Sequence, residues 1–525
     1  MNRRAPTKEY RELDERFSGT VYASKPLILA SALLTLLYFF VLAFWFKIEN
    51  AYLFTLLMFG QAFFLWQGLN YLHTIWNMEY RAPSDPSFAP AVDIFITVAG
   101  EPIDIVEKTV RAALAMDYPD FMVYILNDGY VARKENWKDM EELAKKYAPR
   151  VSCLTRTVPG GAKAGNINHA LSKTARPFFV IFDADHVPSP DFLKKTMGHF
   201  KDPRMGFVQT PQYYVNYAKN EVTRGAWEQQ EIYYGAICKG RNRMGTVTMC
   251  GTNMAIRREA IMDVGGMCDF NIAEDFITGM FIHERGWKSA YVPEVLAEGL
   301  APEDFLSYYN QQLRWARGSL EVFFKWNPLF RRGLSLRQKF LYLSASGYYL
   351  SGLVVIVNAL LPLIFFFTGE VPFAVSTMAL ATVFMPYLFL MIYTLQQSTN
   401  YAYTFRALAF SMGSFIIHLQ ALVDLLVGKK SSFAITSKTR LSGSFLNLAI
   451  PHLIYVGIVA AGVTVAYLRT GMTPSLMTNT AWALINIAVF APFIAAAVQE
   501  EMEEERRVRS LSVSVERRRA NFAYK

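Results

Sequence analysis

The chain is poor in the side chains that bind zinc or form disulfide frameworks. Its 525 residues include four cysteines and seven histidines. The cysteines are Cys153, Cys238, Cys250 and Cys268, and their spacing matches neither a zinc module nor a disulfide scaffold. This composition excludes small metal-stabilised and disulfide-rich secreted folds, and it fits a reduced, cytosolic environment for the polar part of the chain.

Long apolar runs are absent between about Glu79 and Lys339 but frequent on either side. A bilayer span needs about 20 apolar residues. The whole chain is 52% hydrophobic and 18% charged, which predicts a soluble domain set into a bundle of membrane helices. The expected spans lie at 26–46, 51–76, 344–368, 373–395, 446–468 and 480–499.

Residues 1–25 lack the short apolar core and small-residue cleavage site of a signal peptide. They are rich in Lys and Arg, and so is the segment 500–525. The positive-inside rule therefore predicts a cytosolic N-terminal arm over 1–25 and a basic cytosolic tail over 500–525, which we expect to be disordered or bound to a surface. The net charge is +9, but Lys and Arg are concentrated beside the apolar segments rather than in one stripe with interleaved aromatic residues, so we expect no nucleic-acid partner.

The apolar run 405–427 is the doubtful one, because it carries Arg406, His418, Gln420 and Asp424. We expect an amphipathic helix that lies in the membrane interface, followed by a loop over 428–440. Two cytosolic termini require an even number of crossings. The remaining runs satisfy this requirement with two spans in each of three blocks: 26–78, 344–395 and 446–499.

The segment 79–343 alternates short apolar strands with helices, and it is expected to end in interfacial helices near 304–343. Such alternation predicts a mostly parallel sheet covered on both faces. The expected strands are 92–98, 122–126, 151–154 and the run that begins at Phe178, and the expected helices are 103–116, 137–147 and 163–173.

Acidic side chains follow the predicted strands, where open α/β sheets bind their ligands. Asp183 and Asp185 end the most apolar strand, and such a pair suits a divalent cation that carries substrate phosphates. Their alternative role is to cap the next helix. Asp128 follows another strand. Glu101 lies in a turn, where it could bind a base or a ribose or could be an ordinary turn residue. Lys163 follows two glycines at the start of a helix, a position that suits a diphosphate.

Two later patterns carry chemistry. Glu274 and Asp275 are adjacent carboxylates before a helix, and they predict either a general base or an N-cap pair. Gln311, Arg314 and Trp315 fall on adjoining faces of one helix. Trp is a good platform for a sugar and Arg can neutralise a departing phosphate, although the same pair can simply anchor an interfacial helix.

In this order and spacing, the motifs resemble the D, DxD, [TG]ED and QxxRW signature of the processive family-2 glycosyltransferases, such as cellulose, curdlan, mixed-linkage glucan and hyaluronan synthases. Phe433-Ala-Ile-Thr436-Ser-Lys438 resembles the FxVTxK gating loop of cellulose synthases. The resemblance implies a GT-A-like cytosolic domain on a membrane helix bundle. It also implies inverting, processive polymerisation of glucose from UDP-glucose into a β-glucan, with translocation across the plasma membrane.

By position, the resemblance implies a role for each motif residue. Asp275 would be the general base with Glu274 beside it, and Asp185 with Asp183 would hold Mg²⁺ or Mn²⁺. Nucleotide binding would involve Glu101, Asp128, Lys163, Asp183, Gln311 and Arg314. Acceptor binding would involve Trp315, Cys250 and Gly251. Gating would involve Phe433, Thr436 and Lys438.

Two positions depart from the family pattern and leave the donor nucleotide open. Ala99 stands where an aromatic residue is usual, and Asn127 replaces an acid. The alternatives are synthesis of another polysaccharide from a different nucleotide sugar, non-processive transfer to a lipid carrier, or a non-enzymatic membrane receptor or transporter. Expected partners are a UDP-sugar, the growing polysaccharide in a transmembrane channel and membrane lipids, and an export partner in the periplasm or outer membrane stays open. We expect no cyclic-di-GMP-binding β-barrel after the last span.

Overall fold

The computed structural model describes residues 22–400, 402–429, 441 and 445–523, with the backbone alone at 377 and 499–523. Most of the N-terminal arm lies outside the described residues. So does the loop that contains Phe433, Thr436 and Lys438.

A seven-stranded sheet forms the centre of the catalytic domain, in the order β10-β7-β9-β5-β2-β3-β4. β9 runs antiparallel to β5 and β7, and the other pairings are parallel. The predicted mostly parallel sheet is therefore confirmed. The strands are β2 (Val92–Val98), β3 (Phe121–Asn127), β4 (Val151–Thr155), β5 (Phe178–Asp183), β7 (Met205–Gln209), β9 (Met254–Arg257) and β10 (Lys288–Tyr291).

Both faces of this sheet are buried, which explains why its strands are almost continuously apolar. Ile94 and Ile96 of β2 pack into one core, and Phe95 between them packs into the core on the opposite face. The helices around the sheet are α4 (Ile103–Leu114), α5 (Asp139–Lys146), α6 (Ala162–Leu171), α7 (Phe192–Met197), α10 (Arg258–Asp263) and α11 (Glu274–Glu284). Their positions agree closely with the segments expected from the sequence.

A three-stranded sheet adjoins the carboxyl end of β5, in the order β6-β11-β8. Its strands are β6 (Val187–Pro188), β8 (Tyr213–Tyr214) and β11 (Ala297–Gly299). The Asp183–His186 turn therefore lies between the two sheets, because it joins β5 of one to β6 of the other.

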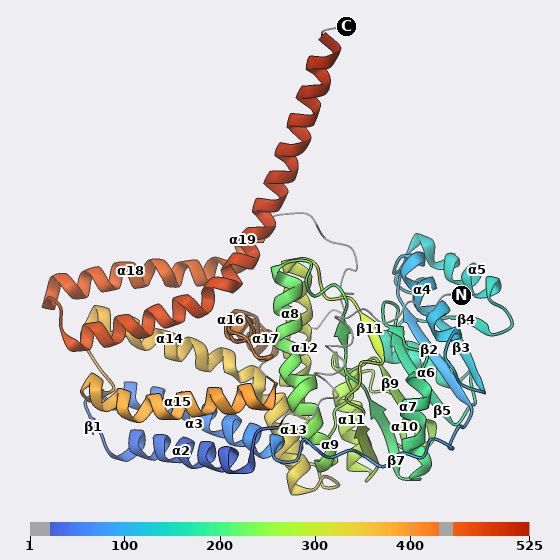
Figure 1. Cartoon of the computed structure of the whole chain (residues 1–525), viewed down its shortest axis with the longest axis horizontal. Coiled ribbons are helices and arrows are strands. Elements are labelled where there is room, and N and C mark those ends of the chain that lie inside the picture. Colours follow the sequence, from blue (N-terminus) through green and yellow to red (C-terminus); the bar gives the residue numbers. More distant parts are fainter. Residues whose placement is uncertain (1–21, 401, 430–440, 442–444, 524–525) are drawn as a thin grey trace.

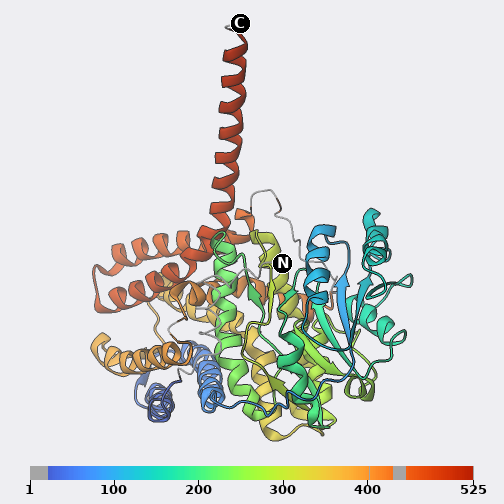
Figure 2. The ribbon, with the colours of Figure 1, turned by 45° about the vertical axis from the view of Figure 1, so that its right-hand side comes forward.

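Long helices lie between the sheets and the membrane bundle and run across the bundle axis (Figures 1 and 2). α8 (Glu221–Ile232) continues through a π-helical turn (Tyr233–Ile237) into α9 (Cys238–Met244). α12 (Phe305–Lys325) and α13 (Leu336–Gly347) complete this layer.

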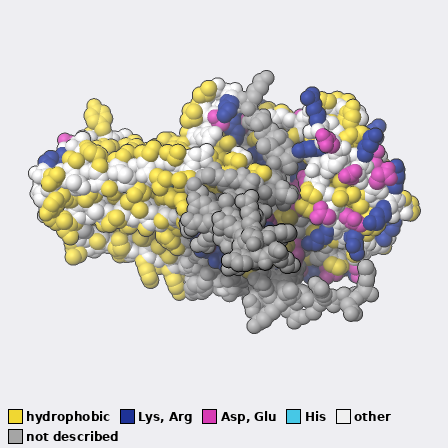
Figure 3. Space-filling model, turned by 90° about the horizontal axis from the view of Figure 1, so that it is seen from above, with side chains coloured by type: hydrophobic (Ala, Val, Ile, Leu, Met, Phe, Trp, Pro, Cys, Tyr) yellow, Lys and Arg dark blue, Asp and Glu magenta, His cyan; other side chains and the backbone are white. Residues whose placement is uncertain are grey.

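In the part of the chain that the structure describes, seven helices are long and apolar enough to cross a membrane. Hydrophobic side chains cover the bundle, whereas charged ones gather on the α/β domain (Figure 3). The chain is thus a multi-pass membrane protein. The bundle consists of α2 (Lys25–Phe44), α3 (Ala51–Ile75), α14 (Ser351–Thr368), α15 (Thr377–Ser398), α18 (Ile450–Thr470) and α19 (Pro474–Ala523).

The seventh apolar segment differs from the others in direction. It forms two helices, α16 (Phe405–Gly413) and α17 (Phe415–Leu426), which are seen end-on in Figure 1 and so lie crosswise to the bundle. Arg406 pairs with Glu221 at 2.9 Å and with Glu228 at 3.1 Å, both on α8. This orientation favours the interfacial placement over a seventh span, and that placement remains a proposal.

The expectation of a disordered or surface-bound tail is wrong for residues 500–523. Helix α19 continues to Ala523 and projects away from the rest of the chain (Figure 1). The segment contains neither Gly nor Pro, and Glu and Arg recur at a separation of four residues, as in Glu505 and Arg509. Both properties favour a helix.

Close packing of α9 on α3 gives a stability prediction. A Cβ at Gly240 would overlap the Thr74 carbonyl oxygen, which is backbone and cannot turn aside. We expect Gly240→Ala to cost about 1–3 kcal/mol of unfolding free energy and to lower the melting temperature in detergent. Gly235→Ala is the matched control, since nothing lies within 4 Å of its Cβ. Equal melting temperatures for the two variants would contradict the packing.

Candidate active site

The site lies where the strand order reverses. β2 is followed by β3 and β4 on one side, whereas β5 returns on the other side of β2. Crevices at such a point bind ligands beyond the carboxyl ends of the strands. Thr97 of β2 and Asp183 of β5 are paired in register there, and the Thr97 hydroxyl donates to Asp183 Oδ1 at 3.2 Å.

Lys163 joins the donor side of this crevice to the segment before β9. Its ammonium forms an ion pair with Asp183 and donates to the Gly251 carbonyl oxygen at 2.8 Å. Burial opposes the charge on Lys163, but the carboxylates of Asp183, Glu274 and Asp275 outweigh it and raise the pKa of the lysine. Lys163 therefore remains a cation close to three acidic groups.

The predicted base, Asp275, lies beside Gly251 and so close to Lys163. Its backbone φ of +79° is left-handed, and a Cβ on it would lie 2.9 Å from Asp275 Oδ2 and 3.6 Å from Lys163 Nζ. The Asp275 carboxylate thus lies over the bare backbone of Gly251. The segment Gly251–Asn253 also contacts the carboxyl end of β5, because the Thr252 hydroxyl accepts a hydrogen bond from the Asp183 backbone N–H at 2.9 Å.

Glu274 and Asp275 begin helix α11. Burial and, after it, the charge of Asp275 raise the pKa of Glu274 to about 7, against the opposing effect of the nearby cations Lys163 and Arg314. Burial also raises the pKa of Asp275, against its hydrogen bond from the Phe276 N–H and the charges of Lys163 and Arg314. A buried carboxyl pair with raised pKa values is suited to proton transfer near neutral pH.

Gln311, Arg314 and Trp315 all lie on helix α12, and Arg314 is the one whose charge reaches the pair. α12 packs closely against the segment before Glu274, because a Cβ at Gly318 would lie 2.5 Å from Cβ of Ala273. The charge of Arg314 acts on both acids, as noted above. Gln311 is 9% exposed, and its Oε1 has no hydrogen-bond partner in the part of the chain that the structure describes.

Asp128 is bound by Arg156, a residue that the sequence reasoning missed. Arg156 donates through Nε to Asp128 Oδ1 at 2.8 Å and through Nη2 to Oδ2 at 2.7 Å. The same guanidinium donates to the carbonyl oxygens of Gly160 and Ala162. Arg156 thus ties Asp128 to the loop that presents Lys163. Local sequence pattern gave no signal for this bond, because it depends on the register of β3 and β4, in which each residue directly follows the pair Asn127–Thr155.

The two departures from the family pattern have different structural consequences. Asn127 is fully buried, and its amide accepts the Gly129 N–H at 2.9 Å and donates to the Trp137 carbonyl oxygen at 2.8 Å. An aspartate could not make the second bond, so this asparagine supports the loop after β3. Near Ala99, Glu101 Oε2 accepts the Ala99 N–H at 2.6 Å, which fixes the turn after β2.

The carboxylates at the end of β5 form the candidate metal position. Asp185 is 3% exposed, and its Oδ2 accepts the Leu300 N–H at 3.1 Å. Its Oδ1 lies 3.5 Å from Nδ1 of His186, whose ring packs against Gly299. Among the described residues, no group of three or more His, Cys, Asp or Glu converges as a complete metal cage. The donor set therefore fits Mg²⁺ or Mn²⁺ only in partnership with substrate phosphates.

Cys250 lies beside the base rather than acting as one. Its Sγ is 3.7 Å from the Tyr233 hydroxyl, and its backbone N–H donates to Gln209 Oε1 at 2.9 Å. Burial and, after it, the charge of Asp275 raise the pKa of the thiol to about 12. The thiol thus stays protonated and is available only as a neutral contact.

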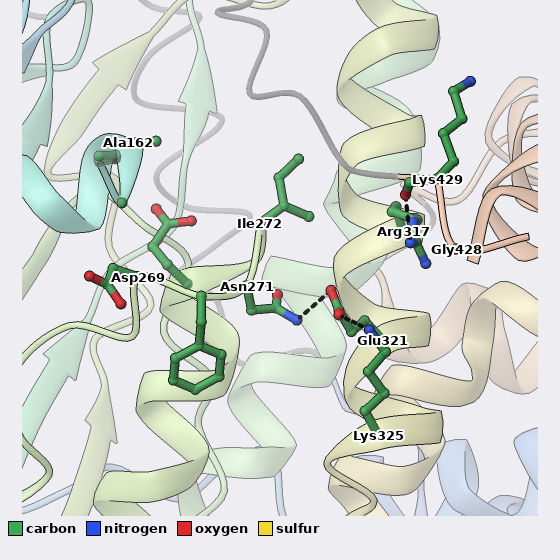
Figure 4. Close-up of a pocket in the computed structure, with 13 residues that line it drawn as sticks. Ala162, Asp269, Asn271, Ile272, Arg317, Glu321, Lys325, Gly428 and Lys429 are labelled. Carbon is green, nitrogen blue, oxygen red and sulfur yellow. Dashed lines mark hydrogen bonds and ion pairs between the residues drawn. The ribbon is translucent and has the colours of Figure 1, made fainter. Parts of the chain in front are cut away.

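A cavity of about 460 Å³ opens beside the acidic pair, between α6, the 269–272 loop and α12 (Figure 4). Lys163 and Glu274 contribute to its wall. On the far side Arg317 donates to the Lys429 carbonyl oxygen at 3.1 Å, and this bond ties the segment after α17 to α12. The cavity gives a small polar molecule room next to the two acids.

Comparisons with known proteins agree with this geometry. Residues 90–318 match the family model described as "Glycosyltransferase like family 2", and residues 247–452 match the model described as "Cellulose synthase". The mannosyltransferase PcManGT from Pyrobaculum calidifontis, solved with GDP-Man and Mn²⁺, superposes with a TM-score of 0.50 at 17% identity, covering 72% of this chain and 100% of its own. That likeness shows the GT-A-like fold.

Relatives in sequence extend the match into the bundle. The cellulose synthase catalytic subunit [UDP-forming] of Komagataeibacter sucrofermentans is 31% identical over 83% of this chain and 60% of its own length. Its counterpart in Pseudomonas fluorescens is 30% identical over 84% and 60%, and cellulose synthase 2 of Novacetimonas hansenii is 30% identical over 84% and 29%. The chain thus spans about a third to three fifths of the length of these relatives. Residues 90–318 thus form a family-2 glycosyltransferase domain, and bacterial cellulose synthases are among the relatives of the chain.

Proposed function

We propose that the enzyme polymerises glucose from UDP-glucose into a β-glucan by an inverting, processive mechanism and passes the product across the plasma membrane. The observation that carries this proposal is the chain of contacts Asp183–Lys163–Gly251–Asp275. It joins the carboxylate at the end of the central strand to the general base within one crevice. The relatives named as UDP-forming cellulose synthases support the choice of donor.

In the proposed reaction, Lys163 binds the donor diphosphate, and Asp128, held by Arg156, lies at the nucleotide. The acceptor hydroxyl oxygen forms a bond to the donor anomeric carbon as the bond from that carbon to the diphosphate oxygen breaks. The hydroxyl proton passes to Asp275. Each cycle therefore lengthens the polymer by one sugar and releases UDP.

Asp185, with Asp183, would hold a bound Mg²⁺ or Mn²⁺, which supplies Lewis-acid stabilisation of the leaving diphosphate. Arg314 adds a cation near Glu274 and Asp275. A metal fits here because the two carboxylates sit at one strand end and interact electrostatically, the charge of Asp185 opposing ionisation of Asp183. The manganese in the mannosyltransferase structure supports a divalent cation without deciding between the two metals.

Processivity rests on helix α12. This helix carries Trp315 directly after Arg314, whose charge acts on the acidic pair, and it packs against α17 and α19. We propose that Trp315, with Gly251 and Cys250, holds the terminal sugar of the acceptor, and that the polymer then leaves between the membrane helices. In this arrangement the catalytic domain and both termini are cytosolic.

Product analysis tests the proposal directly. With Mg²⁺ or Mn²⁺ and UDP-glucose, we expect the purified protein to form a polymer that a linkage-specific glucanase digests. Asp275→Asn should retain UDP binding by calorimetry yet lose at least about 10²-fold in turnover, because it removes the proton acceptor. Asp139→Asn, on the exposed start of α5, is the matched control.

Three results would overturn parts of this proposal. Activity with a different nucleotide sugar would show that the donor is wrong, and a product of one or two sugars would exclude processivity. Undiminished turnover in Asp275→Asn would show that Asp275 is not the general base.

The raised pKa values predict an unusual acidic limb of activity. An ordinary carboxyl would stay ionised down to about pH 4–5. Because burial raises the pKa values of Glu274 and Asp275, kcat/KM for the donor should fall as the pH drops through about 7. Glu274→Gln removes one of the two coupled acids, so in this variant the acidic fall of kcat/KM should occur at a lower pH. A fall at the same pH as in the wild type would contradict the coupling.

Gly251 offers a test of how precisely the base is placed. In Gly251→Ala, the added Cβ meets Asp275 Oδ2 at 2.9 Å, and the side chain rather than the backbone must move. We expect turnover to fall at least about tenfold, because a base displaced by about an ångström loses its alignment.

Gly245→Ala is the control for this variant. Gly245 also has a left-handed φ, of +62°, but nothing lies within 4 Å of its Cβ. It should share the backbone strain and keep its turnover. Similar kinetics for the two variants would show that strain alone, rather than the base, is responsible.

A further inference from the structure

Three segments meet where the bundle adjoins the catalytic domain: the end of α3, helix α9 and the first turn of α13 (Figure 1). Gly240 of α9 lies directly on the Thr74 carbonyl oxygen of α3. Gln338 of α13 donates through Nε2 to the carbonyl oxygen of Gly245, the residue that ends α9, at 3.1 Å. These contacts fix the three segments around one position at the end of a candidate membrane span.

This junction is rich in cations and poor in acids. The segments 70–81, 238–245 and 335–341 contain one carboxylate, Glu79, which lies 4.0 Å from Lys25. The basic side chains of the same segments are His73, Arg81, Lys239, Arg241, Arg243, Arg337 and Lys339. The positive charge of the junction is therefore not balanced by its own acids.

Lys239 is the most unusual of these cations. It is 4% exposed, yet it makes neither a hydrogen bond nor an ion pair within the described part of the chain. Burial and, after it, the charge of Arg81 together lower its pKa to about 8. Its ammonium nitrogen is not one of the fully buried, unbonded polar atoms of the described residues, so it reaches solvent and is open to an anion from outside the chain.

The rim of the junction has the character of a membrane surface. Arg243 is exposed and lies over the Tyr80 ring at 5.0 Å, and Arg337 lies close enough to His73 for their charges to interact. Beside them, Leu336 is 73% exposed and Phe340 is 51% exposed. Basic groups next to exposed apolar side chains are typical of segments that lie at the level of lipid headgroups.

We propose that this junction binds the phosphate headgroup of an anionic phospholipid, with Lys239 and Arg243 as its cationic ligands and Leu336 and Phe340 against the acyl chains. A basic pocket between membrane helices is suited to such a headgroup. The phosphate chemistry alone would also suit a free phosphate ion. The position at the end of α3, beside exposed apolar side chains, favours the lipid.

Native mass spectrometry of the purified full-length protein, titrated with phosphatidylglycerol or phosphatidylcholine, tests the site. Phosphatidylglycerol should bind the wild type more tightly than phosphatidylcholine does. Lys239→Met and Arg243→Gln should each weaken phosphatidylglycerol binding about fivefold and leave phosphatidylcholine unchanged, because each removes one cation near the headgroup.

Lys194→Met is the matched control, since it removes an exposed lysine of α7 that pairs with Asp117, far from the junction in sequence. Arg243→Gln alters an exposed side chain, so it decides the question even if Lys239→Met fails to fold. Equal phosphatidylglycerol affinity in Arg243→Gln and wild type would overturn the proposal. Displacement of the lipid by millimolar inorganic phosphate would assign the site to the free ion instead.

Discussion

The active site depends on one buried positive charge. Lys163 is the cation that allows Asp183, Glu274 and Asp275 to lie within one crevice, and its bond to the Gly251 carbonyl oxygen ties the end of β5 to the segment before β9. Without a cation, three carboxylates in so small a space would repel one another and take up protons. The glycine loop and Arg156, which place Lys163, are therefore as necessary to the site as the acids themselves.

Much of the fold followed from simple sequence patterns. The strands of the central sheet are buried on both faces, so they read as short apolar runs, and each site acid follows such a run or begins a helix. Parallel strands bring their carboxyl ends to one edge, so the sequence alone was enough to group Asp128, Asp183 and Lys163. The GT-A-like fold and the bundle were predicted correctly for this reason.

Other features could not be read from local pattern. The bond between Arg156 and Asp128 depends on the register of β3 and β4. In the sequence Asn127 only replaces an acid of the family pattern, whereas in the structure its amide donates to the Trp137 carbonyl oxygen. The helical continuation of α19 was missed because charge suggested disorder, whereas the spacing of Glu and Arg favours a helix. The loop with Phe433, Thr436 and Lys438 lies outside the described residues, so its role remains a prediction.

The antiparallel strand β9 has a consequence for how such an enzyme can change. Most of the residues that we propose to bind the donor come from 101–185, with Gln311 and Arg314 added from α12, whereas those proposed to hold the acceptor come from 250–315, the stretch in which β9 enters the sheet in the opposite direction. The two stretches meet at the bare backbone of Gly251. Under the proposed function, a new sugar donor and a new polymer end would be acquired largely by substitutions in separate stretches of the chain, provided that this one glycine stays in place.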